Sequence, residues 1–148
     1  MKICFFSLVF FIGSMGLCWE EEPVFRGEWV ATAGPTRSFR GKWIGQALPG
    51  DPNSLHGSWT LTGGAGRAIL SGTWSARKTE QGWRGTWSAQ DQHGRALSGT
   101  WRADESNGLR SLKQLLERTL KTEVSGSWRT RGREGHWWLK GFSPPRNQ

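Results

Sequence analysis

The residues that most often carry catalysis or bind metals are few in this chain and are not grouped. The three histidines, His56, His93 and His136, have no metal-ligand spacing. Acid–base or nucleophilic catalysis needs paired carboxylates, or a nucleophile beside a base. The inward-facing positions inferred below carry almost no ionisable side chain. We therefore predict a protein without catalytic residues, a metal site or a cofactor, and with solvated surface histidines.

One glycine-rich segment, Gly63-Gly64-Ala65-Gly66, could in principle cradle a phosphate. Phosphate loops of this kind lead from a strand into a helix. Here the segment joins two expected strands, so we predict a hairpin turn instead.

The charge of the chain suggests a different kind of chemistry. Lys+Arg total 20 against 12 Asp+Glu, a formal net charge of +8. Such a surface can attract polyanions, including nucleic acid, anionic glycans and lipid headgroups. The predicted contacts lie on one basic helix face: Arg110, Lys113, Arg118 and Lys121. The alternative is an ordinary solvated surface, and no specific nucleic-acid partner is expected.

Tryptophan is the most unusual feature of the composition, with 11 Trp and no Tyr in 148 residues. Eight of these tryptophans stand in a repeated Gly-x-Trp motif. The first six follow one another at steps of 14, 16, 15, 13 and 14 residues, and the last two at steps of 27 and 9. Regular self-similarity of this kind indicates repeated structural units. The eight are Trp29, Trp43, Trp59, Trp74, Trp87, Trp101, Trp128 and Trp137.

Each copy of the motif alternates in polarity. Around Trp101, one parity holds the apolar or small residues Leu97, Gly99, Trp101 and Ala103. The other parity holds the polar residues Ser98, Thr100 and Arg102. Strict alternation over this length indicates a half-buried strand. Gly and Pro-rich links separate the copies, so we predict eight strands in an antiparallel up-and-down meander.

The glycine of the motif has a packing reason. If a two-residue turn at Arg131-Gly132 joins the last two strands, Trp128 faces Gly135 and Trp137 faces Gly126. An aromatic ring over a strand glycine fills the space that the glycine leaves. We predict the same reciprocal pairing for the other neighbouring copies.

Closure of the meander hides its apolar face and removes both sheet edges. The fold class is therefore all-β, an eight-stranded closed barrel in one domain over residues 24–142. Leucines at helical spacing predict one amphipathic helix at about 108–121, between strands six and seven, covering an end or a seam. An outer-membrane barrel is excluded in this scheme, because the outward face carries arginines.

The two ends of the chain are expected to lie outside the barrel. Residues 1–16 look like a secretory signal peptide, with cleavage as late as Cys18. We therefore expect a secreted or periplasmic protein without a membrane span in the mature chain. A lipid anchor at Cys18 and a retained N-terminal anchor are the alternatives. Residues 143–148 are expected to form a disordered tail.

The sequence Leu-Ser-Gly-Thr-Trp, at residues 70–74 and again at 97–101, resembles the Gly-x-Trp signature of the calycins, the avidin and lipocalin barrels. The resemblance implies an eight-stranded meander barrel that binds a small, largely apolar ligand in its mouth. This chain departs from both families. Lipocalins carry the motif on the first strand alone, and avidins use polar residues and Tyr where this chain has residues such as Ala31 and Gly45. No binding residue is transferred, and biotin is not the expected ligand.

The inward tryptophans allow two interpretations, a core packed with its own side chains or the aromatic wall of a pocket. We predict a non-enzymatic protein that holds a small apolar or aromatic ligand, with Trp83 and Trp138 at a rim or contact surface. The alternative is a basic interaction module with a dry barrel that docks on an anionic envelope component or a partner protein. The candidate ligand contacts are Trp29, Trp43, Trp59, Trp74, Trp83, Trp87, Trp101, Trp128 and Trp137.

Overall fold

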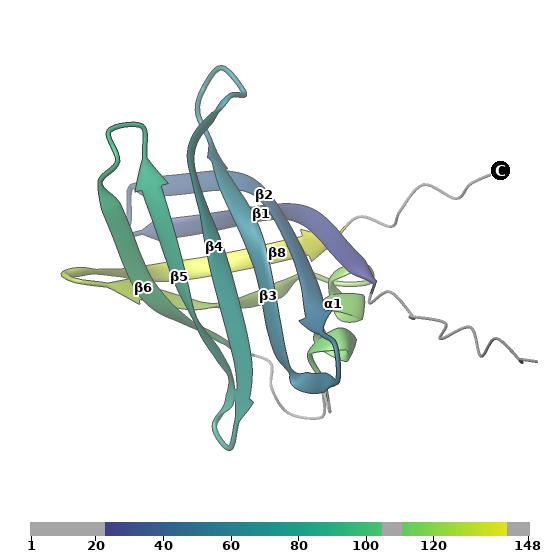
Figure 1. Ribbon diagram of the computed structural model, residues 1–148. Coiled ribbons are helices and arrows are strands. Elements are labelled where there is room, and N and C mark those ends of the chain that lie inside the picture. The colour runs from purple at the N-terminus through teal and green to yellow at the C-terminus, as the bar shows by residue number, and fades with distance from the viewer. Residues whose placement is uncertain (1–22, 105–110, 142–148) are drawn as a thin grey trace, which may run out of the picture.

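Eight strands follow one another in chain order, as the repeat predicts (Figure 1). The computed structural model describes residues 23–104 and 111–141. Every neighbouring pair is antiparallel, and β1 pairs with β8, so the sheet is a closed barrel and the predicted fold class is confirmed. The strands are β1 (Val24–Ala33), β2 (Arg37–Leu48), β3 (Asp51–Thr62), β4 (Ala68–Thr79), β5 (Gly82–Asp91), β6 (Ala96–Ala103), β7 (Val124–Thr130) and β8 (Arg133–Gly141).

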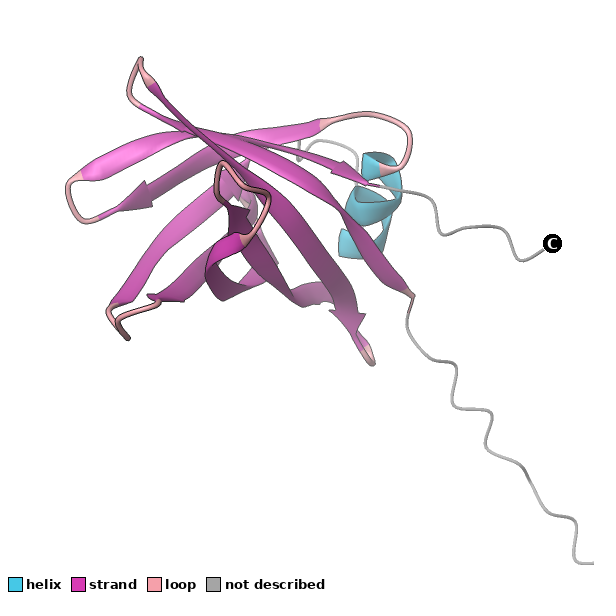
Figure 2. Cartoon of the chain, turned by 90° about the horizontal axis from the view of Figure 1, so that it is seen from above, coloured by secondary structure: helices cyan, strands magenta, loops and turns pink. Residues whose placement is uncertain are grey.

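A short helix, α1 (Leu112–Thr119), lies between β6 and β7. The hydroxyl of Ser111 caps it by accepting a hydrogen bond from the Gln114 amide at 3.3 Å. Leu115 and Leu116 are 5% and 2% exposed and belong to the core cluster of the barrel. Figure 2 shows α1 at one end of the barrel, where the predicted amphipathic helix is confirmed.

The four sequential hairpins have the predicted register. In the β7–β8 hairpin, Trp128 faces Gly135 and Trp137 faces Gly126. Gly132 stands in the connecting turn at φ 79°, a conformation that glycine adopts without strain. The β1–β2, β3–β4 and β5–β6 hairpins repeat this reciprocal exchange of tryptophan and glycine.

The register between consecutive hairpins differs from the prediction. There Trp43 faces Trp59, and the same holds for Trp74 with Trp87 and for Trp101 with Trp128. Reciprocal pairing at every interface would leave the strands without stagger, and a closed barrel needs stagger. A two-residue shift supplies it and keeps each tryptophan on the inner face. The prediction of reciprocal pairing at these interfaces is therefore wrong.

Some of the predictions fall outside the described residues. These are the signal peptide at 1–16, cleavage or lipid anchoring at Cys18, the start of the predicted helix at 108–110 and the tail at 143–148. Within residues 23–104 and 111–141, no helix has the length and apolarity to cross a membrane.

Candidate functional site

The eight motif tryptophans form two layers inside the barrel. The odd layer comes from β1, β3, β5 and β7, and its consecutive ring centroids lie 5.7, 6.1 and 6.3 Å apart. The even layer comes from β2, β4, β6 and β8, with spacings of 6.5, 6.1 and 5.6 Å. All six contacts are edge-to-face, an arrangement that aromatic pairs favour. The odd layer is Trp29, Trp59, Trp87 and Trp128, and the even layer is Trp43, Trp74, Trp101 and Trp137.

Glycines and backbone carbonyls of neighbouring strands fix the indoles in place. Trp74 of β4 lies over Gly57 of β3, and its Nε1 donates to the carbonyl of Ile44 on β2 at 3.1 Å. Trp29 lies over Gly41 and donates to the Thr60 carbonyl at 3.1 Å. Seven of the eight indoles donate to a backbone carbonyl in this way, at 3.0–3.3 Å. Because these N–H groups are used by the wall, they are not available to bind a ligand.

Trp87 is the exception. Its Nε1 makes no hydrogen bond within the described part of the chain, although its ring lies over Gly99 like the others over their glycines. It therefore carries the one indole N–H of the two layers that a bound molecule could use.

The two ends of the interior differ in access. At the α1 end, Trp43 is 2% exposed and Trp137 is 9% exposed. The other six indoles are half-buried, including the whole odd layer. Beyond the odd layer, on the side away from α1, the inward positions of the strands carry Leu61, Leu70 and Leu97. Leu97 is 47% exposed. The barrel is thus closed by α1 at one end and presents an aromatic and aliphatic interior at the other, which we call the open end.

Trp83 does not lie at an exposed rim, so that prediction is wrong. It is 1% exposed and belongs to the same core cluster as Leu115 and Leu116 of α1. Its Nε1 is buried and has no hydrogen-bond partner among the described residues, and the Lys78 ammonium lies 5.6 Å from its ring centroid. Because α1 covers the end of the barrel where Trp83 lies, Trp83 is buried although it is close to the end of a strand. Trp138 points outward and is half-buried, 6.2 Å from the His136 ring.

The polar residues singled out in the sequence lie on the surface. His56 and His136 are exposed on outward positions, and His93 is exposed in the turn after β5. No group of three or more His, Cys, Asp or Glu able to hold a metal ion occurs among the described residues. The segment 63–66 is a hairpin turn between β3 and β4, as predicted, and Gly66 donates its amide to the Gly63 carbonyl at 2.9 Å.

The two carboxyl groups with shifted pKa values have structural roles in turns. Backbone and side-chain hydrogen bonds from Arg95, with a further backbone bond from His93, lower the pKa of Asp91. A hydrogen bond with Ser54 and one from the Asn53 backbone, with a weaker attraction from Arg77, lower the pKa of Asp51. In both cases the hydrogen bonds stabilise the ionised carboxylate of an aspartate at a strand end, beside a turn.

The predicted basic helix face is less uniform than the sequence suggested. Lys113 and Lys121 are exposed, but Glu117 stands between them at the same four-residue spacing and is also exposed. Arg118 is half-buried, and Arg110 lies outside the described residues.

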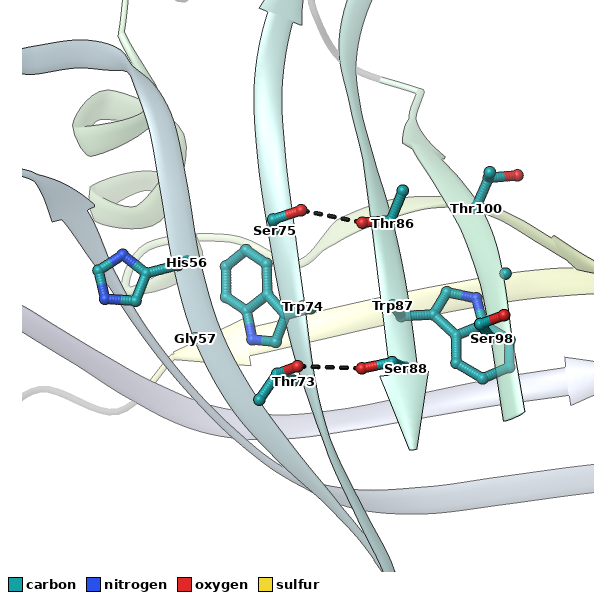
Figure 3. Close-up of a pocket in the computed structure, with 11 residues that line it drawn as sticks. His56, Gly57, Thr73, Trp74, Ser75, Thr86, Trp87, Ser88, Ser98 and Thr100 are labelled. Atoms are coloured by element: carbon teal, nitrogen blue, oxygen red, sulfur yellow. Dashed lines mark hydrogen bonds between the residues drawn. The ribbon is translucent and has the colours of Figure 1, made fainter. Parts of the chain in front are cut away.

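A groove of about 620 Å³ crosses the outside of β3, β4, β5 and β6. Its floor is the backbone of four residues that pair across neighbouring strands, one on each strand: Gly57, Trp74, Trp87 and Gly99. Short polar side chains line both walls, and two hydrogen bonds cross from β4 to β5, Thr73–Ser88 at 3.1 Å and Ser75–Thr86 at 3.0 Å (Figure 3). The sequence pattern did not indicate this groove, because the groove depends on the register between strands.

No protein-family model matches this chain, and comparisons with curated proteins and with solved structures find no significant match. The likeness to the calycins is therefore one of architecture, an eight-stranded antiparallel meander closed on itself.

Proposed function

We propose that this protein is a non-enzymatic binding protein of the secreted or periplasmic space, and that it holds a small apolar or aromatic ligand at the open end of the barrel. The observation that carries the proposal is the partial exposure of the complete odd layer: four inward indoles remain half-buried where α1 does not cover them. A barrel packed only for stability would bury rings of this size, since each buries 150–250 Å² when fully covered.

The chemistry of this end selects the class of ligand. Three of the four odd-layer N–H groups are bonded to the wall, so recognition rests on apolar contact and ring stacking, with Trp87 as the one indole donor. The apolar surface of the interior continues toward the mouth of the barrel at Leu61, Leu70 and Leu97. A flat, largely uncharged molecule fits this surface best.

Fluorescence titration with the neutral probe phenylnaphthylamine tests the proposal. We expect saturable binding that changes little with salt. Trp87→Phe should weaken it roughly fivefold, because the smaller phenyl ring makes less contact with the probe, at a cost of about 1 kcal/mol. The variant breaks no indole hydrogen bond among the described residues, so the fold should be kept.

Trp138→Phe is the matched control, since it makes the same chemical change on the outer face. It should leave the affinity unchanged. Absence of saturable binding, or an equal effect of the two substitutions, would contradict the proposal.

A further inference from the structure

The exterior groove has a shape that suits an extended chain. Its floor crosses four strands, and neighbouring strands lie about 4.8 Å apart, so the floor is roughly 14 Å long. Every outward side chain along it is short or polar, and nothing bulky interrupts the floor. These side chains are His56, Thr73, Ser75, Thr86, Ser88, Ser98 and Thr100.

A row of arginines runs parallel to the groove on β4, β5 and β6. Each arginine lies two residues from a serine or threonine of the groove wall. Arg77 of β4 faces Arg84 of β5, and Arg84 faces Arg102 of β6. All three side chains are exposed. Like charges that face each other directly on neighbouring strands destabilise a sheet. This row, Arg77, Arg84 and Arg102, we call the arginine row.

The charges of the arginine row are only partly compensated among the described residues, where Asp51 attracts Arg77. In residues 23–104 and 111–141, no carboxylate lies within ion-pair distance of the three guanidinium groups. Arg84 donates to the side-chain oxygen of Gln81, and Arg102 donates to the Ser127 hydroxyl at 2.9 Å. The nearby Arg129, which faces Thr100, is paired with Glu134 at 2.9 Å. An anion bound along the row would relieve the repulsion among its members.

We propose that the groove and the arginine row together bind a linear acidic polysaccharide. The arginines bind its carboxylate or sulfate groups, because guanidinium groups bind such anions through paired hydrogen bonds. The hydroxyls of the groove walls donate to and accept from sugar hydroxyls, since each Ser and Thr can do both. Apart from the imidazole of His56, the groove lining offers no outward aromatic ring on which a nucleic-acid base could stack, and it has no outward apolar side chain that would enter a membrane.

Binding to three immobilised polymers tests this site: heparin, which carries sulfates; polygalacturonate, which carries carboxylates; and neutral dextran. We expect the protein to bind one or both acidic polymers, more weakly as salt rises, and not dextran. Binding of neither acidic polymer would overturn the proposal.

The decisive comparison uses two double variants of equal net charge. Arg84→Gln with Arg102→Gln should weaken binding about tenfold or more and lower its salt dependence. Lys113→Gln with Lys121→Gln removes two charges from α1 and the turn that follows it, and should change affinity less than about threefold. Equal losses would show that net charge alone attracts the polymer, and would overturn the site.

Three further measurements test whether a folding defect, nucleic-acid binding or the open end of the barrel accounts for the result. Without polymer, the arginine double variant should unfold at the same temperature as the parent or higher, because a repulsion has been removed. The rise in unfolding temperature caused by polymer should be lost in that variant. Single-stranded DNA of matched charge should bind less tightly than the acidic polysaccharide, and tighter binding of DNA would overturn the assignment. Binding of phenylnaphthylamine at the open end should be unaffected by the arginine substitutions.

Discussion

Substitution of Gly57 by Ala tests the nesting of indole on glycine most sharply. A Cβ at Gly57 would collide with the backbone carbonyl oxygen of Ile44 and would lie 2.6 Å from Cε2 and Nε1 of the Trp74 indole. The same indole donates to that carbonyl at 3.1 Å. One methyl group therefore opposes both the close approach of β2 and the position of the Trp74 ring.

The expected cost can be worked from these two contacts. Overpacking a well-filled interior costs about 1–3 kcal/mol. Loss of the indole hydrogen bond adds about 1 kcal/mol. The free energy of unfolding should thus fall by roughly 2–4 kcal/mol, and the unfolding temperature by roughly 8–16 °C, at about 4 °C per kcal/mol for a domain of this size.

Chemical and thermal unfolding, followed by near-UV circular dichroism, measure this cost. Gly64→Ala is the matched control, because a Cβ at Gly64 has no atom within 4 Å. It should change stability by no more than about 0.5 kcal/mol. In a Trp74→Leu background the part of the Gly57→Ala cost that comes from the ring should disappear, which gives non-additivity of about 1 kcal/mol or more. A Gly57→Ala cost no greater than that of Gly64→Ala would refute the nesting argument.

Three further substitutions test the rest of the barrel. Trp43→Phe should lower the free energy of unfolding by about 2–4 kcal/mol in urea, because it empties space in the core and leaves the Lys140 carbonyl without its 3.2 Å hydrogen bond; a cost under about 0.5 kcal/mol would count against a packed even layer. Leu116→Ala should cost about 2–4 kcal/mol in the same assay, because the 2% exposed side chain anchors α1 in the core, and a neutral effect would mean that the helix is not docked. Asp91→Asn should lower stability near pH 6, and the effect should diminish as the pH falls below 3.8: the pKa of Asp91 is depressed from its usual 3.8, so its contribution is present above that value and is lost as pH falls through the folded-state pKa. A gap between parent and Asp91→Asn unfolding temperatures that stays constant over this pH range would contradict the role of the charged carboxylate.

The sequence predicted those parts of the fold that depend on local pattern. Alternation around each tryptophan indicated the strands, and the short turn at Arg131-Gly132 fixed the register that brings Trp128 over Gly135. The leucines of α1 likewise indicated a helix with one buried face.

What the sequence did not show depends on how separate hairpins meet. The opposition of Trp43 and Trp59 follows from the stagger of the closed barrel, which no single segment encodes. The burial of Trp83 depends on where α1 docks. The arginine row and the groove also depend on this register: Arg77 and Arg84 face each other only because β4 and β5, which belong to separate hairpins, pair with Trp74 opposite Trp87.

An NMR titration that follows the indole N–H resonances while phenylnaphthylamine is added shows directly whether a ligand enters the open end of the barrel. We expect the resonances of the odd layer to shift, above all that of Trp87, with little change at the buried Trp43. Shifts confined to the outward Trp138, or none at any indole, would contradict a ligand site inside the open end of the barrel.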